Sequence, residues 1–461
     1  IDTTKSVVVH EIEKLMKDRD NGEGIGENTP EQRVIIFDGM AILNKIKLGT
    51  GIRDCTQLAE RFLSILLNEP SDEVRVVFDR YIKESLKKTT RSKRHGKVGA
   101  ASTQYEIKGD TNLENTSMKK LLSHDTTKQK LTSFLGKCIA KKFRAMNKQF
   151  AVSFNTCTLT NIPSLDSELL NEHEHEEADT LMILHAIDIA AADPFRKLIV
   201  SSPDTDVLLL LVHYQAMIPP DTHFMTGSGD KTRLISVLNA KESLPERWSS
   251  LLGFHAFTGC DITSKFLGKS KLSCWRTFTR APTHVLAAFR QLGNLETDLE
   301  TVSKGLEAFV CQLYNSKSTE DLSELRWQLY AQTQQASRLP PTKAALKYKI
   351  LRGHLACSIW KNSHTANPRQ LNPENYGWQK LNDEDLTPVL SDNPPAPEAI
   401  IELCVCSCTV TRCINNQCGC RRNKLKCTDM CQCKQHGCKN DEEDVEEDVN
   451  PEWGSEEEDN I

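Results

Sequence analysis

Three short apolar segments in the first half of the chain each lead into aspartate residues, and this arrangement constrains the fold more than any other feature. Each segment has the length of a strand, consists mostly of apolar residues such as Val, Ile, Leu and Phe, and is separated from the next by sequence of helical periodicity. The segments are residues 33–37, 74–78 and 197–201, and the aspartates that follow them are Asp38, Asp79, Asp204 and Asp206. Strands that alternate with helices predict an α/β fold with a mainly parallel sheet. Such sheets bind ligands at the carboxyl ends of their strands, where these aspartates would lie.

Two further acidic motifs extend this set. Glu177 and Asp179 lie two residues apart near the start of a predicted helix, and Asp261 follows a Gly-Cys turn. Directly before the first motif, His173 and His175 are expected to be exposed helix-start residues rather than ligands of a transition metal. A fold that gathers seven mutually repelling carboxylates needs cations, and oxygen ligands select Mg²⁺ or Mn²⁺ over zinc. A single aspartate after a strand is usually a turn or helix cap, but the complete ordered set is far less expected by chance.

In this order the acidic residues resemble the flap-endonuclease-like branch of the PIN-domain nucleases, over roughly residues 30–280. The resemblance implies a PIN-like domain with a two-metal site that cleaves phosphodiesters. It implies these metal-site residues: Asp38, Asp79, Glu177, Asp179, Asp204, Asp206 and Asp261. The family's basic segment after the second aspartate matches a run whose cations would hold the scissile phosphate, namely Lys87, Lys88, Arg91, Lys93 and Arg94. A solvated helix face is the alternative for that run. The chain departs from the family in residues 264–271, where one glycine replaces a glycine-rich turn.

Ten of the 17 cysteines fall between Cys404 and Cys438. So dense a segment has no room for an apolar core and needs metal or disulfides to fold, and its Cys-x-Cys pairs favour metal. The first residues lack the pattern of a signal peptide, which favours a reducing compartment and therefore metal again. The spacing resembles half of a tesmin-type CXC domain, which implies a zinc cluster with shared thiolates and DNA binding. The implied ligands are Cys406, Cys408, Cys413, Cys418, Cys420, Cys427, Cys431, Cys433 and Cys438, and Cys404 is spare.

The net charge of -5 hides an asymmetry along the chain. Residues 441–461 carry 12 acidic and no basic side chains, so the remainder has 58 basic against 51 acidic residues and a formal charge of about +7. A basic body favours a polyanionic partner, and we expect nucleic acid, above all DNA. Within the cysteine segment, cations such as Arg412, Arg421 and Lys424 lie between the predicted ligands, where they could face phosphates. A zinc module that serves only protein contacts or stability is the alternative.

These features predict an ordered series of domains: an N-terminal helix and linker (1–30), a PIN-like domain (31–280), a helical extension (281–363), a Pro/Asn-rich linker (364–400), a CXC zinc domain (401–440) and an acidic tail (441–461). The leading hypothesis is a metal-dependent nuclease in the nucleus. The alternative is a catalytically inactive nucleic-acid-binding protein, of mobile-element origin, that uses the PIN-like fold as a scaffold. No run of about 18 apolar residues is present, so no membrane-spanning helix is expected. The chain begins with Ile1, which leaves open that it is a fragment.

Overall fold

The computed structural model describes two compact units, each considered separately. The first comprises Ile1–Leu325 and Pro340–Leu390, and the second Arg326–Leu339 and Ser391–Ile461. Within them the structure describes residues 6–17, 32–49, 51–81, 85–86, 104–314, 319–333, 339–382, 385–391, 406–428, 431–433 and 437–440. No helix in these ranges is long and apolar enough to cross a membrane.

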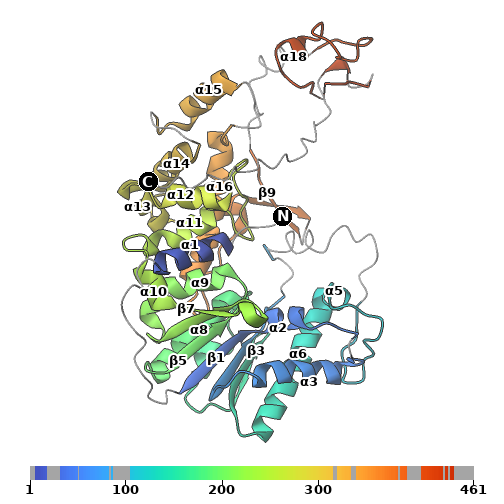
Figure 1. Cartoon of the computed structure of the whole chain (residues 1–461), viewed down its shortest axis with the longest axis vertical. Coiled ribbons are helices and arrows are strands. Elements are labelled where there is room, and N and C mark those ends of the chain that lie inside the picture. Colours follow the sequence, from blue (N-terminus) through green and yellow to red (C-terminus); the bar gives the residue numbers. More distant parts are fainter. Residues whose placement is uncertain are drawn as a thin grey trace, which may run out of the picture. The chain divides into compact units, whose positions relative to one another are not determined.

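A seven-stranded sheet forms the centre of the first unit, with strand order β4-β3-β2-β1-β5-β6-β7 (Figure 1). Its strands are β1 (Arg33–Asp38), β2 (Glu73–Val77), β3 (Gln149–Phe154), β4 (Cys157–Thr160), β5 (Lys197–Ser201), β6 (Thr222–Thr226) and β7 (Arg233–Ser236). β1 pairs in parallel with β2 and β5, and β3 and β6 continue the parallel arrangement outward. Only the edge strands β4 and β7 are antiparallel among the described strands of this sheet. The predicted α/β fold with a mainly parallel sheet is confirmed.

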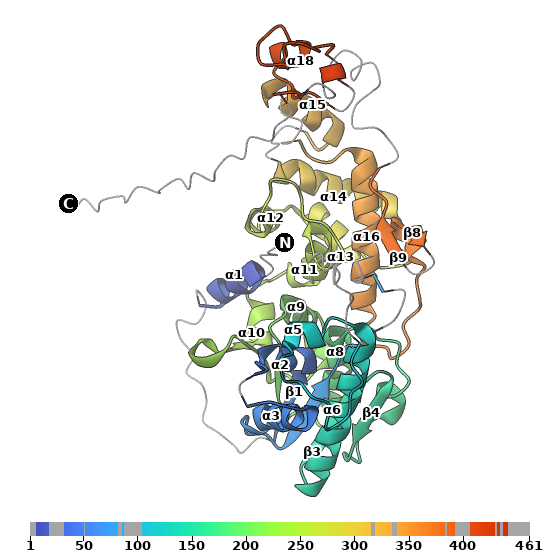
Figure 2. The ribbon, with the colours of Figure 1, turned by 90° about the vertical axis from the view of Figure 1, so that its right-hand side faces the viewer.

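Helices cover both faces of the sheet, so its central strands are buried on either side (Figures 1 and 2). α3 and α6 cover one face of β1 to β3, where alternate residues such as Val74 and Val76 join a large apolar core. α8 covers the other face of β1 and β2. The helices of this α/β part are α1 (Ser6–Lys17), α2 (Gly39–Lys45), α3 (Cys55–Leu67), α5 (Met118–Leu121), α6 (Asp125–Ala145), α7 (Ser167–Leu170), α8 (Ala178–Ala192), α9 (Thr205–His213) and α10 (Val237–Glu242).

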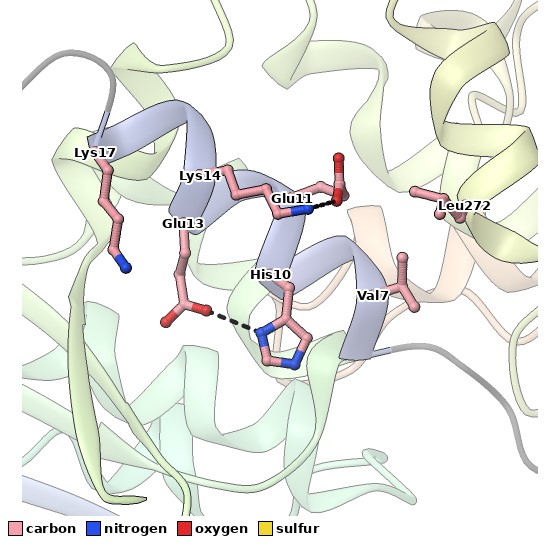
Figure 3. A pocket seen from close by; sticks show the side chains of 7 residues that line it. All are labelled: Val7, His10, Glu11, Glu13, Lys14, Lys17 and Leu272. Atoms are coloured by element: carbon pink, nitrogen blue, oxygen red, sulfur yellow. Dashed lines mark hydrogen bonds and ion pairs between the residues drawn. The ribbon is translucent and has the colours of Figure 1, made fainter. Parts of the chain in front are cut away.

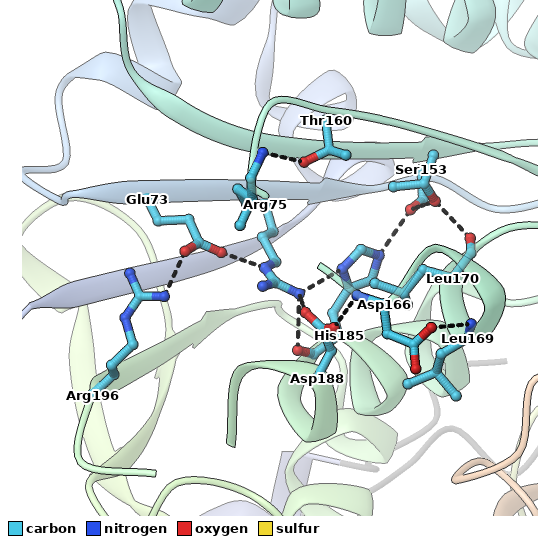
Figure 4. A network of polar contacts seen from close by, with 12 residues as sticks. Glu73, Arg75, Ser153, Thr160, Asp166, Leu169, Leu170, His185, Asp188 and Arg196 are labelled. Atoms are coloured by element: carbon cyan, nitrogen blue, oxygen red, sulfur yellow. Dashed lines mark hydrogen bonds and ion pairs between the residues drawn. The ribbon is translucent and has the colours of Figure 1, made fainter. Parts of the chain in front are cut away.

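A buried polar network joins β2 to α8 on the second face (Figure 4). Arg75 is 1% exposed, and its guanidinium lies 2.5 Å from Glu73 Oε1 and 2.5 Å from Asp188 Oδ2. Arg196 contacts the second oxygen of Glu73 at 2.6 Å. His185 of α8 lies 2.8 Å from the Ser153 hydroxyl of β3. Burial and the adjacent guanidinium hold the pKa of His185 well below its ordinary value, so its ring is neutral. The network fixes α8 against β2 and β3 of the sheet.

A helical extension follows the sheet and shares an aromatic core that includes Phe254, Phe289 and Phe309. Its helices are α11 (Leu251–Thr258), α12 (Lys271–Phe278), α13 (Thr283–Gln291), α14 (Leu299–Leu313) and α16 (Lys343–Lys361). The helix α15 (Leu322–Thr333) begins at the end of this stretch, and from Arg326 onward it belongs to the second unit. α11 contacts α13 and α16, and it also contacts α9, which links the extension to the α/β part (Figure 2). The chain between residues 251 and 361 is therefore largely helical in its described part.

Part of the segment that the sequence indicated as a linker forms a hairpin. β8 (Trp378–Asn382) and β9 (Asp385–Pro388) pair antiparallel within residues 364–400. Trp378 and Leu386 pack on Leu355 of α16, and the Arg352 guanidinium donates to the carbonyl oxygens of Gly377 and Val389 at 2.9 and 2.7 Å. The Pro and Asn content of this segment indicates a linker, but its apolar residues Trp378 and Leu386 attach it to the first unit.

Candidate metal centres

The register of the parallel strands brings the predicted aspartates to one edge of the sheet. Asp38, the last residue of β1, pairs with Val77, two residues before Asp79. On the other side Phe37 pairs with Ser201, three residues before Asp204. The carboxyl ends of β1, β2 and β5 therefore present acidic side chains at the same place, as expected for a ligand site in a parallel sheet.

Asp179, Asp204 and Asp206 form the compact centre of this edge. Each offers a carboxylate oxygen, and the three oxygens lie within 4.8 Å of one another. Asp179 and Asp206 are buried, and Asp204 is half-buried. Hard oxygen donors at this spacing fit a divalent cation such as Mg²⁺ or Mn²⁺. The other four predicted carboxylates, Asp38, Asp79, Glu177 and Asp261, are not members of this compact group.

Asp38 and Asp204 cap helices, which is the usual role of an aspartate that follows a strand. Asp38 Oδ1 accepts from the Ala41 amide at 2.9 Å at the start of α2, and Asp204 Oδ1 accepts from the Asp206 amide at 3.0 Å at the start of α9. Burial, together with the nearby carboxylates of Asp79 and Asp204, raises the pKa of Asp38 to about 7. A cation bound beside Asp38 must therefore displace a proton near neutral pH.

Asp79 and Glu177 both lie at the start of α8. Asp79 Oδ1 accepts from the amide of Ala178, the first residue of this helix, at 2.9 Å. Glu177 is the N-cap residue, but its side chain makes no capping hydrogen bond. Asp79 thus orients the helix that carries Asp179, and an acidic side chain near a helix N-terminus interacts favourably with the helix dipole.

His255 of α11 contacts the site and was missed by the sequence analysis. Its Nε2 lies 2.8 Å from Asp206 Oδ1, and both side chains are buried. The ring lies against Trp360 of α16, with centroids 5.7 Å apart. Next to a carboxylate the Nε2–H donates, so one Asp206 oxygen is oriented by this hydrogen bond. A single histidine in an apolar helix carries no sequence signal, because only the fold brings it within reach of Asp206.

Asp261 lies in the turn that follows α11 and is half-buried. Gly259 begins this turn with φ +121°, a conformation that only glycine adopts without strain. Lys271 stabilises this turn, because its Nζ donates to Thr258 Oγ1 at 2.8 Å and to the Gly259 carbonyl at 2.9 Å. Lys271 is buried, and its role is to support this turn.

Two other predictions have different outcomes. The basic run of Lys87, Lys88, Arg91, Lys93 and Arg94 lies outside the described residues. The expectation that His173 and His175 are exposed is wrong, since they are 1% and 5% exposed. His175 bonds Thr180 Oγ1 and the Thr365 carbonyl, each at 2.8 Å, which draws the segment before α8 into the fold. Burial lowers the pKa of both histidines, so both rings are neutral at pH 7.

In the second unit the described cysteines form a single cluster. Eight are buried against one another, with Cys408 and Leu425 packed beside them, and a short helix, α18 (Gly419–Arg422), lies within it. The cysteines are free thiols. Neighbouring Sγ atoms lie 3.4 Å apart for Cys406 and Cys433, 3.6 Å for Cys406 and Cys413, and 3.8 Å for Cys406 and Cys427. A tetrahedron of thiolates about 2.3 Å from a zinc ion has edges of roughly 3.8 Å, so the spacing fits metal better than disulfides.

The cluster divides into three overlapping groups of four cysteines, each compact enough for one ion. The groups are Cys406, Cys413, Cys427 and Cys433; Cys406, Cys420, Cys427 and Cys431; and Cys406, Cys408, Cys413 and Cys418. Cys406 belongs to all three groups, and Cys413 and Cys427 belong to two each. Cys438 is buried in the cluster but lies outside these groups, and Cys404 falls outside the described residues. The cluster can hold divalent metal through shared thiolates.

A surface hollow beside α1 does not offer comparable chemistry (Figure 3). Its charged side chains pair with one another: Lys14 contacts Glu11 at 2.7 Å, and His10 contacts Glu13 at 3.3 Å. Glu13 also pairs with Arg233 of β7 at 2.6 Å. The first two pairs lie within α1, and the Glu13–Arg233 pair attaches α1 to β7.

Comparisons with known proteins find similarity to solved structures but not to a described family. No family model and no curated protein matches the chain. The crystal structure of the T5 D15 protein co-crystallised with metal ions matches with 10% identity and a TM-score of 0.34, over 72% of this chain and 91% of that chain. The functional inferences below therefore rest on the chain's own residues.

Proposed function

We propose that the chain is a metal-dependent nuclease that hydrolyses phosphodiester bonds, with DNA as its substrate. The observation that carries the proposal is the convergence of Asp179, Asp204 and Asp206 oxygens within 4.8 Å at the carboxyl edge of a parallel sheet. The order of the acidic residues along the chain, which resembles flap-endonuclease-like PIN nucleases, supports the choice of reaction. Two divalent cations in such a site, when bound, activate a water and stabilise the leaving oxygen.

In this proposal the side chains divide into two kinds of role. Asp38, Glu177, Asp179, Asp204 and Asp206 hold the cations directly or through water, and Asp79 and Asp261 complete the acidic edge. Asp79 and His255 are positioning residues, since one orients α8 and the other orients Asp206. The basic run of Lys87, Lys88, Arg91, Lys93 and Arg94 would hold the scissile phosphate. The cysteine module would bind zinc and support DNA or partner binding, in a nuclear protein.

Cleavage of labelled flap, hairpin and single-stranded substrates with and without added Mg²⁺ or Mn²⁺ tests the proposal. We expect Asp204→Asn to lose about 10²–10³-fold or more of the activity, because a bound metal supplies several kcal/mol of transition-state stabilisation. Asn caps a helix as well as Asp does, so α9 should remain intact. Asp298→Asn is the matched control, because Asp298 caps the exposed start of α14 and lies in the helical extension.

Equal activity in the wild type and in Asp204→Asn would rule out this site as a nuclease centre. It would leave the alternative, a nucleic-acid-binding protein with a nuclease-like scaffold. Cleavage that persists without any divalent cation would contradict the role of metal. Omitting the cation is preferable to adding a strong chelator, which would also strip the cysteine cluster.

Loss of the His255 contact should weaken metal binding without unfolding the chain. We expect His255→Phe to lower Mn²⁺ affinity by about 10–100-fold, as do other outer-shell changes at metal sites. His255→Asn keeps an N–H donor and should recover part of this loss, which a purely packing role would not predict. Calorimetric titration with Mn²⁺ measures the metal affinity of both variants, with Asp204→Asn as the reference for a damaged site. Thermal unfolding verifies that each variant is folded. Unchanged affinity in His255→Phe would contradict the positioning role.

A further inference from the structure

A long stretch of the first unit contains basic side chains but no acidic ones. Residues 126–165 contain seven Lys or Arg side chains and no Asp or Glu. Most of these cations belong to α6, the longest described helix of the α/β part. Its buried face carries Leu131, Leu135, Ile139 and Phe143, which join the core against the sheet. The remaining face is open to solvent.

Four cations lie on one line of that open face. Lys130, Lys137, Lys141 and Arg144 follow the spacing i, i+7, i+11 and i+14, which keeps them within a narrow arc of the helix. Lys137, Lys141 and Arg144 are exposed, and among the described residues no carboxylate pairs with them. Lys130 pairs with Glu106. At 1.5 Å per residue the line is about 21 Å long.

The line leads away from the acidic edge of the sheet. α6 begins beside Tyr81, two residues after Asp79: Gln129 Nε2 donates to the Tyr81 carbonyl at 2.6 Å, and Lys128 lies 4.7 Å from the Tyr81 ring. The helix ends at Ala145, just before β3 starts at the opposite edge of the sheet. Gly136 lets α6 lie close on β3, because a side chain there would collide with Phe154. The packing of α6 therefore fixes the position of the line of cations. The line starts near the carboxylate site and runs across the sheet toward the amino ends of its strands.

We propose that the exposed face of α6, with Lys130, Lys137, Lys141 and Arg144, binds the phosphate backbone of duplex DNA. A rise of 3.4 Å per nucleotide along each strand gives about six nucleotide steps beside the 21 Å line. The face has cations but no exposed aromatic ring, since Phe134 packs on the core and Phe143 is buried. Proteins that bind single strands stack the bases on such rings, whereas binding of a duplex backbone requires only cations placed opposite its phosphates. The choice of DNA as the partner rests on the proposed nuclease function, whereas the binding of a phosphate backbone rests on the cations of α6 alone.

The salt dependence of duplex binding tests this face independently of cleavage. The Asp204→Asn full-length chain, without added divalent cation or chelator, is titrated with a fluorescent duplex and with a single strand of equal length. We expect the triple variant Lys137→Gln, Lys141→Gln and Arg144→Gln to reduce the slope of log affinity against log salt by about 3, since three phosphate contacts are removed. Glutamine is a good helix former, so α6 should persist, and the thermal unfolding midpoint verifies this.

The matched control removes the same number of positive charges from elsewhere in the first unit. Lys231→Gln, Lys304→Gln and Lys347→Gln together remove three exposed cations that lie outside α6, and should leave the slope unchanged. The proposal is overturned if both triple variants change the slope equally, or if the α6 variant changes single-strand binding as much as duplex binding. A chain that binds duplex through α6 but never cleaves it would retain this inference and disprove the nuclease assignment.

Discussion

Removal of metal from the cysteine cluster is expected to unfold the described part of residues 406–440 and to leave the first unit folded. Nearly the whole interior of this segment is cysteine, with Leu425 as the one partly buried apolar companion among its described residues. Without metal the thiols cannot supply the burial that offsets chain entropy. Structural zinc contributes about 10–16 kcal/mol to the folding of small zinc modules, which is the largest effect expected anywhere in the chain.

Hydrogen exchange on the full-length chain, with and without a zinc chelator, measures this outcome together with native mass spectrometry of the metal content. We expect about three zinc ions per chain, one for each four-cysteine group, and rapid exchange in the segment once they are removed. Cys408→Ser should lower the bound metal, whereas Cys157→Ser, an exposed cysteine of β4, is the matched control and should not. Slow exchange in the metal-free segment would show that its fold does not depend on metal.

Replacement of Arg75 should produce the largest loss of stability in the first unit. Arg75→Ala leaves the carboxylates of Glu73 and Asp188 buried beside it with one cation removed. Breaking a buried ion pair from one side costs about 3–5 kcal/mol, because the remaining charge cannot reach water. Chemical denaturation followed by circular dichroism should show this as a lower unfolding midpoint.

Two companion variants separate charge from packing. Arg75→Met restores most of the lost volume but not the charge, so it should be nearly as unstable as Arg75→Ala. Glu300→Ala removes an exposed pair with Lys304 on α14 and should cost at most about 0.5 kcal/mol. A stable Arg75→Met chain would mean that packing, rather than charge compensation, explains the buried network.

The acidic edge could be predicted from sequence because its signals are local. An apolar strand followed by aspartate is readable within a few residues, and parallel pairing then forces the strand ends together. The position of Asp38 and Asp204 at one edge of the sheet can therefore be predicted without knowledge of their neighbours. The same reasoning found the cysteines, whose spacing is itself the signal.

The rest of the site depends on contacts between distant residues. His255 reaches Asp206 across 49 positions of sequence, and nothing near it in the chain marks it. Arg75 interrupts an apolar strand and would be expected to point outward, but α8 supplies Asp188 on the face where it is buried. Trp378 and Leu386 were hidden in a Pro/Asn-rich segment, where composition indicated a linker. In each case the deciding partner comes from another element.

The amino ends of three helices meet the acidic edge, and from this we expect the carboxylate site and the cysteine cluster to assemble with their metals in opposite orders. Asp38 and Asp204 accept backbone amides at the starts of α2 and α9, and Asp79 accepts one at the start of α8. These N–H groups and helix dipoles offset part of the repulsion among the carboxylates, and burial and the nearby acidic groups raise the pKa of Asp38 to about 7. The carboxylate site can thus form first and take up cations afterwards. For the cysteine cluster we expect the opposite order, in which the segment acquires structure only as metal binds.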